Sequence, residues 1–173
     1  TQLWVKNITP KSTGVYQFFF FFKADIVVLP NNDIVVQHTS YDPVRLTSEN
    51  IMYSMSPSGQ VKWSKTIKNP AMRQMKMVYN IPLGAIIWTG HIYNNNTSSS
   101  EIYTYHLNAL TGEYVKANRI AGLASQIPIS FNQTSLHNLV YLTNNNTVLM
   151  SSPTIDLLWA YKYEDSKQPN TQM

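Results

Sequence analysis

The chain has no cysteine, and charged residues are scarce. Cysteine is absent from all 173 positions, which excludes disulfide bonds and thiolate metal sites. Asp, Glu, Lys and Arg together make up 13% of the residues, while hydrophobic residues make up 43%. A disordered chain has the opposite balance, so we expect a folded chain that buries a substantial core.

Long apolar runs and helical patterns are also missing. The longest unbroken apolar run has five phenylalanines, whereas a membrane-spanning helix needs roughly 20 apolar residues. We therefore expect no transmembrane segment. No segment carries the apolar stripe of a long amphipathic helix. The sequence opens at Thr1 without the pattern of a signal peptide, which indicates a processed or partial product.

Motifs for catalysis and for cofactor binding are lacking as well. The four histidines are scattered, and none forms the closely spaced pair of a zinc-binding helix. The sequence has no nucleophile elbow, no phosphate-binding loop and no dinucleotide fingerprint. We therefore assign no catalytic, cofactor-binding or metal-binding residue, and we expect a protein that is not an enzyme.

Positive charge predominates without clustering. The net charge is +4, and the 13 Lys and Arg residues are spread along the chain. A nucleic-acid-binding surface gathers basic residues and interleaves them with aromatic ones, and no such cluster is present. We therefore expect a solvated basic surface and no nucleic-acid partner.

Sheet-forming residues are abundant, and they occur in repeats. Aromatic residues make up 12% of the chain and β-branched residues are plentiful, which favours strands. Internal repetition decides the fold, so it is considered before single motifs. One strand-like segment with a basic residue near its middle recurs at residues 4–8, 63–67, 116–120 and 159–163.

Turns and hairpins recur in register with these segments. Three turns that contain Pro or Gly precede the last three segments, at residues 56–59, 109–112 and 152–155. A hairpin pattern with a Pro-, Gly- or Asn-rich centre recurs at residues 26–36, 77–88 and 139–150. The third repeat is shorter than the others, so it either lacks a strand or uses its hairpin differently.

Four short strands in a period of roughly 40 to 55 residues are typical of β-propeller blades rather than of a β-sandwich. We therefore expect an all-β chain of about three four-stranded antiparallel repeats. A closed propeller has about four to eight blades, so the chain predicts part of a larger or oligomeric array. The expected divisions are a repeat region at 1–165, with an outer strand at 1–8 and repeats at about 15–67, 68–120 and 121–165, and a linker or tail at 166–173.

The turn and the strand after it resemble the quinoprotein-like β-propeller family, whose blades carry the motif Ala-x-Asp-x-x-Thr-Gly-x-x-x-Trp. Thr111 and Gly112 match the Thr-Gly pair, while Gly59 and Trp63 match Gly-x-x-x-Trp. The resemblance spans about residues 15–165. It implies that each motif tryptophan docks against the neighbouring blade, and the residues with this implied role are Trp4, Trp63 and Trp159, together with Gly59 and Gly112.

Three positions depart from the family motif. Asn108 stands in place of Asp, Lys116 in place of Trp, and Ile155 in place of Gly. The polar residues that bind the quinone cofactor in the family's complete propellers have no counterpart that we can match. The resemblance therefore implies architecture, and we expect no cofactor.

Acceptor triplets for N-linked glycans are frequent. Several lie in or beside Asn-rich tracts typical of loop tips, where a bulky glycan has room. Glycans require passage through the secretory pathway, so the triplets predict an extracellular or cell-surface glycoprotein. An Asn-rich composition by itself would also produce such triplets. The acceptors are Asn7, Asn95, Asn96, Asn132 and Asn145.

The phenylalanine run supplies the interaction candidates Phe18, Phe19, Phe20, Phe21 and Phe22. A strand of five aromatic rings presents apolar surface on both faces, which suits burial between blades or contact with another protein. Together with the incomplete blade count, the run predicts a non-enzymatic structural or protein-interaction module. Its partners would be copies of itself or other proteins, in a larger assembly or filament. Two alternatives stay open: a fragment of a quinoprotein-like enzyme, and an intracellular scaffold propeller in a large complex.

Overall fold

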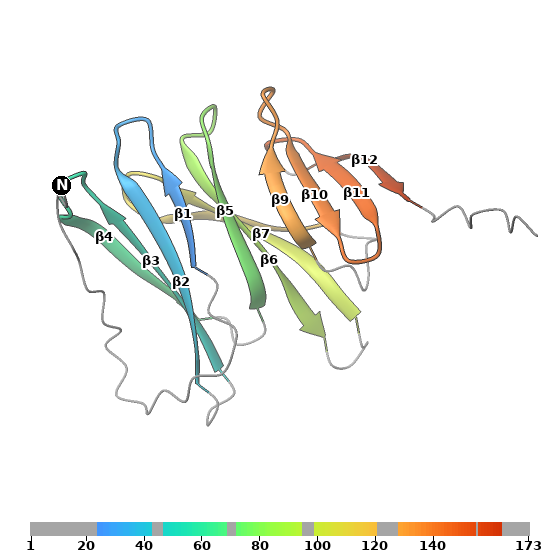
Figure 1. Ribbon diagram of the computed structural model, residues 1–173, viewed down its shortest axis with the longest axis horizontal. Helices are drawn as coiled ribbons and strands as arrows, with labels where there is room; N and C mark the ends of the chain where they lie inside the picture. The colour runs from blue at the N-terminus through green and yellow to red at the C-terminus, as the bar shows by residue number, and fades with distance from the viewer. Residues whose placement is uncertain are drawn as a thin grey trace, which may run out of the picture.

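Twelve β-strands form three four-stranded antiparallel sheets in the computed structural model (Figure 1). The structure describes residues 24–42, 47–68, 72–94, 99–120, 128–154 and 156–163, and no helix occurs in these ranges. The expectation of an all-β chain built from about three four-stranded antiparallel units is confirmed.

Each sheet is a meander in which every strand pairs with the next strand along the chain. The first sheet contains β1 (Ala24–Val28), β2 (Ile34–Asp42), β3 (Thr47–Met55) and β4 (Val61–Lys68). The second sheet contains β5 (Met72–Asn80), β6 (Ala85–Asn94), β7 (Ser99–Asn108) and β8 (Tyr114–Ile120). The third sheet contains β9 (Pro128–Gln133), β10 (Leu139–Thr143), β11 (Thr147–Ser151) and β12 (Leu157–Lys162).

The sheets pack face to face in chain order (Figure 1). Successive side chains of a strand point to opposite faces, so the second sheet buries one face against each neighbour. Its Ile86 and Trp88 join Val35 and Met52 of the first sheet in one cluster. Its Ile87, by contrast, joins a second cluster with the third sheet, whose members are Ile87, Ile102, Phe131, Leu139, Tyr141 and Leu149.

The first strands of the three sheets, β1, β5 and β9, lie side by side where the sheets meet (Figure 1). Each sheet then extends outward to its fourth strand. The fourth strands β4, β8 and β12 contain the three described copies of the strand with a central basic residue. The recurring strand is therefore the last strand of each sheet.

Several of the described turns between strands are tight and contain one left-handed residue. Asn32 in the β1–β2 turn has a φ of 63°, and His137 in the β9–β10 turn has the same value. In both turns the N–H of this residue donates to the carbonyl three positions earlier, at 2.9 Å. A type I turn followed by a left-handed residue is a common way to close a hairpin.

The hairpin of the third repeat was aligned wrongly with the hairpins of the other two. Residues 26–36 and 77–88 form the first and second strands of their sheets, whereas residues 139–150 form the second and third strands, β10 and β11. The first strand of the third sheet is β9, which pairs with β10. The third repeat therefore has all four strands and uses its hairpin differently.

Candidate protein-interaction site

The first sheet docks on the second through Trp63 of β4. The Trp63 indole Nε1 donates to the carbonyl of Ala109, in the β7–β8 turn, at 3.2 Å. The indole ring also lies on Gly112 of that turn, where an added Cβ would come within 2.6 Å of it. Gly112 has a φ of 68°, a backbone conformation that residues other than glycine rarely adopt. Gly112 therefore supplies both the left-handed backbone of this turn and the space in which the Trp63 ring packs.

Asn108 organises the turn that receives Trp63. Its side-chain Oδ1 accepts hydrogen bonds from the backbone N–H of Leu110 at 2.9 Å and of Thr111 at 3.2 Å. An aspartate makes the same turn with the same acceptor atom. Asn108 therefore builds this turn as an aspartate would.

The second sheet docks on the third at the equivalent place. Lys116 stands four residues after Gly112, as Trp63 stands four residues after Gly59. Its Nζ donates to the carbonyl of Thr154, in the β11–β12 turn, at 3.4 Å, and the side chain of Asn118 donates to the same oxygen at 3.2 Å. The departure from Trp to Lys thus exchanges an aromatic contact for a polar one at the same position.

A buried polar network also ties the second sheet to the third. The Asn80 side chain is fully buried, and its Nδ2 donates to Gln133 Oε1 at 3.0 Å and to the His137 carbonyl at 3.2 Å. The Gln133 amide in turn lies 3.0 Å from His137 Nδ1. On the other side, the Asp25 carboxylate of β1 accepts the backbone N–H of Met77 in β5 at 2.6 Å. These bonds fix the relative positions of the three first strands.

The outermost strand of the third sheet, β12, is exposed along its whole length. Trp159 stands in this strand where Trp63 stands in β4, and 44% of its surface is exposed. Trp63 is partly buried against the first cluster. Trp63 and Lys116 therefore contact the following sheet. Trp159, at the equivalent position, has no following sheet in the described part of the chain.

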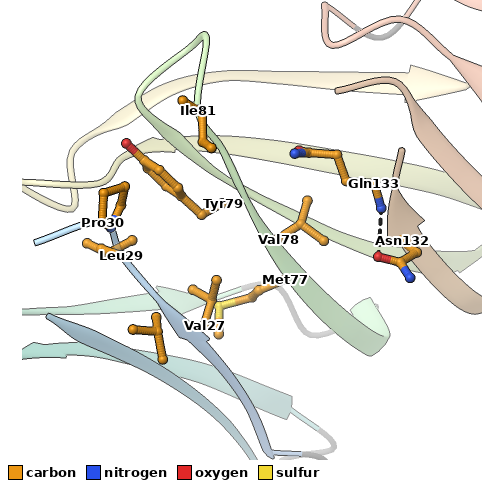
Figure 2. A pocket seen from close by; sticks show the side chains of 10 residues that line it. Val27, Leu29, Pro30, Met77, Val78, Tyr79, Ile81, Asn132 and Gln133 are labelled. Atoms are coloured by element: carbon orange, nitrogen blue, oxygen red, sulfur yellow. Dashed lines mark hydrogen bonds between the residues drawn. The ribbon is translucent and has the colours of Figure 1, made fainter. Parts of the chain in front are cut away.

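A cavity of about 400 Å³ lies where the first strands meet (Figure 2). Its walls come from the β1 end, from β5 and from β9, and they are mostly apolar. Among the described residues that line it there is no carboxylate, histidine, lysine or arginine, so this described lining supplies no charged side chain and no histidine for acid–base work. The lining includes Leu29, Pro30, Met77, Tyr79, Asn132 and Gln133.

The two groups with the largest pKa shifts, His106 and Tyr141, lie between the second and third sheets rather than in this cavity. Burial and, to a smaller extent, the positive charge of Lys116 together lower the pKa of His106 in β7 to about 4. Burial likewise raises the pKa of Tyr141 in β10. Within the described ranges no three His, Asp or Glu side chains are grouped to hold a metal ion. The same ranges contain no helix long and apolar enough to cross a membrane.

The candidates taken from the sequence fall in different places. Trp63, Gly112 and Trp159 lie at the positions described above, and Gly59 lies in the β3–β4 turn with a φ of 82°. Asn132 is an exposed residue of β9 beside the cavity, whereas Asn145 is exposed in the β10–β11 turn. The candidates outside the described residues are Trp4, Asn7, Asn95, Asn96 and Phe18 to Phe22.

Several contact residues were missed from the sequence. Asn80 and Asp25 resemble ordinary residues at strand ends, and their partners lie 53 and 52 residues away. Only Lys116 had a signal, because it occupies the motif position of Trp63. A polar residue in register with Trp63 predicts a polar contact at the equivalent place.

Comparison with known proteins assigns no family to the chain. No family model matches it, and no curated protein matches it. A solved structure of a protein of unknown function from Bacteroides caccae aligns with 14% identity and a TM-score of 0.48. The alignment covers 86% of this chain and 49% of that protein, so this chain spans about half of its length.

Proposed function

We propose that the chain is a non-enzymatic β-propeller-type repeat module that acts as a structural or protein-interaction part of a larger extracellular assembly. The observation that carries the proposal is the serial docking of the sheets. Trp63 of the first sheet contacts the second sheet, and Lys116 of the second sheet contacts the third sheet. Trp159 of the third sheet is 44% exposed. A repeat array of this kind is completed by further sheets.

The central cavity supports a binding role over a catalytic one. Its described lining is apolar apart from a tyrosine and amide side chains, and the strongly shifted histidine lies elsewhere, between the second and third sheets. Catalysis requires convergent groups that move protons or stabilise charge. The apolar sheet faces instead suit contact with another protein.

The extracellular part of the proposal rests on the glycan acceptors. Asn145 is the best placed of the described acceptors, because it lies exposed in a short turn at the rim of the third sheet. Asn132 lies beside the cavity, and its Oδ1 accepts the backbone N–H of Gln133 at 2.8 Å. We expect a glycan on Asn145 in preference to Asn132.

Native mass of the protein isolated from its own source, with and without glycosidase, tests this function. The expected result is a mass well above 19.8 kDa from bound partners or copies, with a further decrease when glycans are removed. Peptide mapping should locate a glycan at Asn145. A bare chain of 19.8 kDa without partners would overturn the proposal.

A further inference from the structure

Strand β12 is the last strand of the third sheet, and its outer edge has no partner among the described strands (Figure 1). Every side chain of the strand is exposed, and so is Tyr163 directly after it. The edge of a sheet presents N–H and C=O groups that can pair with a strand of another molecule. The exposed edge of β12 is therefore a candidate for such pairing.

The backbone of β12 directs the hydrogen-bonding groups of two residues outward. The N–H of Tyr163 donates to the carbonyl of Asn146 at 2.9 Å, so Tyr163 bonds on the side of β11. Along an antiparallel strand, residues bond to one side and to the other in alternation. Tyr161 therefore also bonds toward β11, opposite Val148. The N–H and C=O groups of Ala160 and Lys162 point outward.

The edge of β12 carries fewer charges than the edges of β4 and β8. Natural sheets discourage pairing at an edge with charged side chains, especially lysine. β4 contains three lysines, and β8 contains a lysine and an arginine. β12 has a single charged residue, Lys162, at its end. A β-bulge occurs at the same place in all three strands, so the bulge does not distinguish them.

Three aromatic side chains line one face of this strand. Trp159, Tyr161 and Tyr163 alternate along the chain, and 44%, 60% and 65% of their surfaces are exposed. They point away from the second sheet, because Leu149, which pairs with Ala160, is buried toward that sheet. The rings of Tyr161 and Tyr163 already pack edge to face, with their centroids 5.2 Å apart. We call these three residues the aromatic stripe.

We propose that two copies of the chain pair antiparallel through β12, with Tyr161 of one copy opposite Tyr161 of the other. In this register the outward groups of Ala160 bond to those of Lys162 in the other copy. Trp159 lies opposite Tyr163 of the other copy, and cross-strand aromatic pairs stabilise a sheet. Lysine is opposite alanine, so no like charges face each other. The contact is self-complementary, as a two-fold axis requires.

A second copy matches this strand because the two halves of the aromatic stripe are equivalent about Tyr161. Each ring of one copy then faces a ring of the other, and the two third sheets join into one continuous sheet. The pairing also covers part of Trp159, which has no following sheet in the described part of the chain. This inference rests on the assembly role proposed above and names one of its contacts.

Single cysteines test the register, because the chain has no cysteine of its own. In the full 173-residue chain, Tyr161→Cys should form a disulfide-linked dimer under mild oxidation, because opposed residues of this type lie about 4.5 Å apart between their Cα atoms. Tyr163→Cys is the matched control. Its two copies would lie about 14 Å apart, so this variant should stay monomeric. If Tyr161→Cys crosslinks no better than the control, the proposal is overturned.

Mixing two cysteine variants gives a sharper test of the same register. Trp159→Cys and Tyr163→Cys should each fail to crosslink alone, because each new thiol lies far from its own copy. The mixture should form a disulfide-linked dimer of one chain of each kind, because these two positions face each other. Absence of this mixed dimer would contradict the proposed register.

Sedimentation velocity of the full chain measures the contact without a crosslink. The wild-type chain should dimerise reversibly. Ala160→Pro should weaken dimerisation at least about tenfold, because proline removes an outward N–H on each copy while the bonds to β11 stay. A wild-type chain that stays monomeric at every concentration would overturn the proposal, and so would a folded proline variant that dimerises like the wild type.

Tyr161→Lys decides the question if the proline variant loses its fold. The substitution keeps every backbone N–H and replaces an exposed side chain, so circular dichroism should match the wild type. It opposes two like charges across the two-fold axis and should prevent dimerisation. Undiminished dimerisation of this variant would overturn the proposal.

The native protein separates this inference from the proposed function. If the native protein runs as a large assembly while the cysteine variants do not crosslink as expected, the proposed function stands and only the β12 contact fails. If the native protein is a lone chain and the cysteine variants do not crosslink, both fail.

Discussion

Gly112 is held by two separate constraints at the scale of one residue. Its backbone is left-handed, and its missing side chain leaves the space that the Trp63 ring occupies. Gly84 in the β5–β6 turn has a similar φ of 56°, yet an added Cβ there would meet nothing within 4 Å. Substituting Gly84 therefore measures the cost of backbone strain alone, whereas substituting Gly112 adds the cost of losing the Trp63 contact.

Gly84→Ala should lower the free energy of unfolding by about 1–2 kcal/mol, the cost of a left-handed alanine. Gly112→Ala should lower it by at least about 3 kcal/mol, because the methyl group also displaces the Trp63 ring. Urea unfolding of both variants checks this difference. In a Trp63→Ala background the two substitutions should become equally costly, and equal costs in the wild-type background would contradict the docking geometry.

His106 should make stability sensitive to mild acid. Its pKa is lowered from 6.5 to about 4 in the folded chain, so the unfolded chain takes up a proton first as the pH falls. The stabilising effect is complete above pH 6.5 and is lost between about pH 6.5 and 4. From pH 7 to pH 5 we expect a loss of about 2 kcal/mol in the free energy of unfolding.

His106→Leu should remove most of this loss, and urea unfolding at the two pH values measures it. The replacement also removes a buried Nε2 that has no hydrogen-bond partner among the described residues. Stability at pH 7 should therefore fall little. If the variant loses as much stability as the wild type between the two pH values, the acid sensitivity belongs to other groups.

At the scale of elements, polar contacts fix how neighbouring sheets sit on each other. Two apolar sheet faces can shift relative to each other at little cost in free energy. A buried amide, by contrast, satisfies its hydrogen bonds in only one arrangement. Asn80 joins the end of β5 to β9 and to the β9–β10 turn. It therefore sets the register of the second sheet on the third.

Asn80→Ala should lower the free energy of unfolding by about 2–3 kcal/mol, because partly buried acceptors on Gln133 and His137 lose their donor. Asn132→Ala in β9 is the matched control, because Asn132 is exposed and its Oδ1 accepts the backbone N–H of the adjacent Gln133. The control should change stability by less than about 0.5 kcal/mol. Thermal or urea unfolding compares the two, and equal effects would show that the network contributes nothing.

At the scale of the whole molecule, the sheets form a series in which each contacts its neighbours. One apolar cluster joins the first and second sheets, and a separate cluster joins the second and third. Stability in such an array is approximately a sum of repeat and nearest-neighbour contributions. A destabilising substitution in one terminal sheet should therefore affect that sheet most and the sheet at the opposite end least.

Leu149→Ala should reduce amide hydrogen-exchange protection most strongly in β9–β12 and least in β1–β4. Met52→Ala, a buried residue of the first cluster, should give the reverse pattern. Each substitution deletes a fully buried side chain and should cost about 2–5 kcal/mol. Uniform loss of protection in both variants would instead identify a single cooperative unit.

Local patterns in the sequence determined much of the fold. The turns that end at Gly59 and Gly112 and the strands after them depend on nearby residues, so spacing alone located β4 and β8. Strand β9 was missed because it is short and has two alternating apolar residues, Ile129 and Phe131. Pairing with β10 makes this segment a strand, and that pairing displaced the hairpin alignment of the third repeat.

The sequence by itself determined the all-β class, the number of sheets and the place of Trp63 and Trp159 in the last strands of their sheets, because hydrophobic alternation and turn chemistry act over a few residues. The tertiary structure decided which of those tryptophans is covered. Trp63 and Trp159 stand in the same local pattern, yet only Trp63 has a following sheet among the described residues. It also decided the roles of Asn80, Asp25 and Lys116, because each acts through a partner that is distant in the chain.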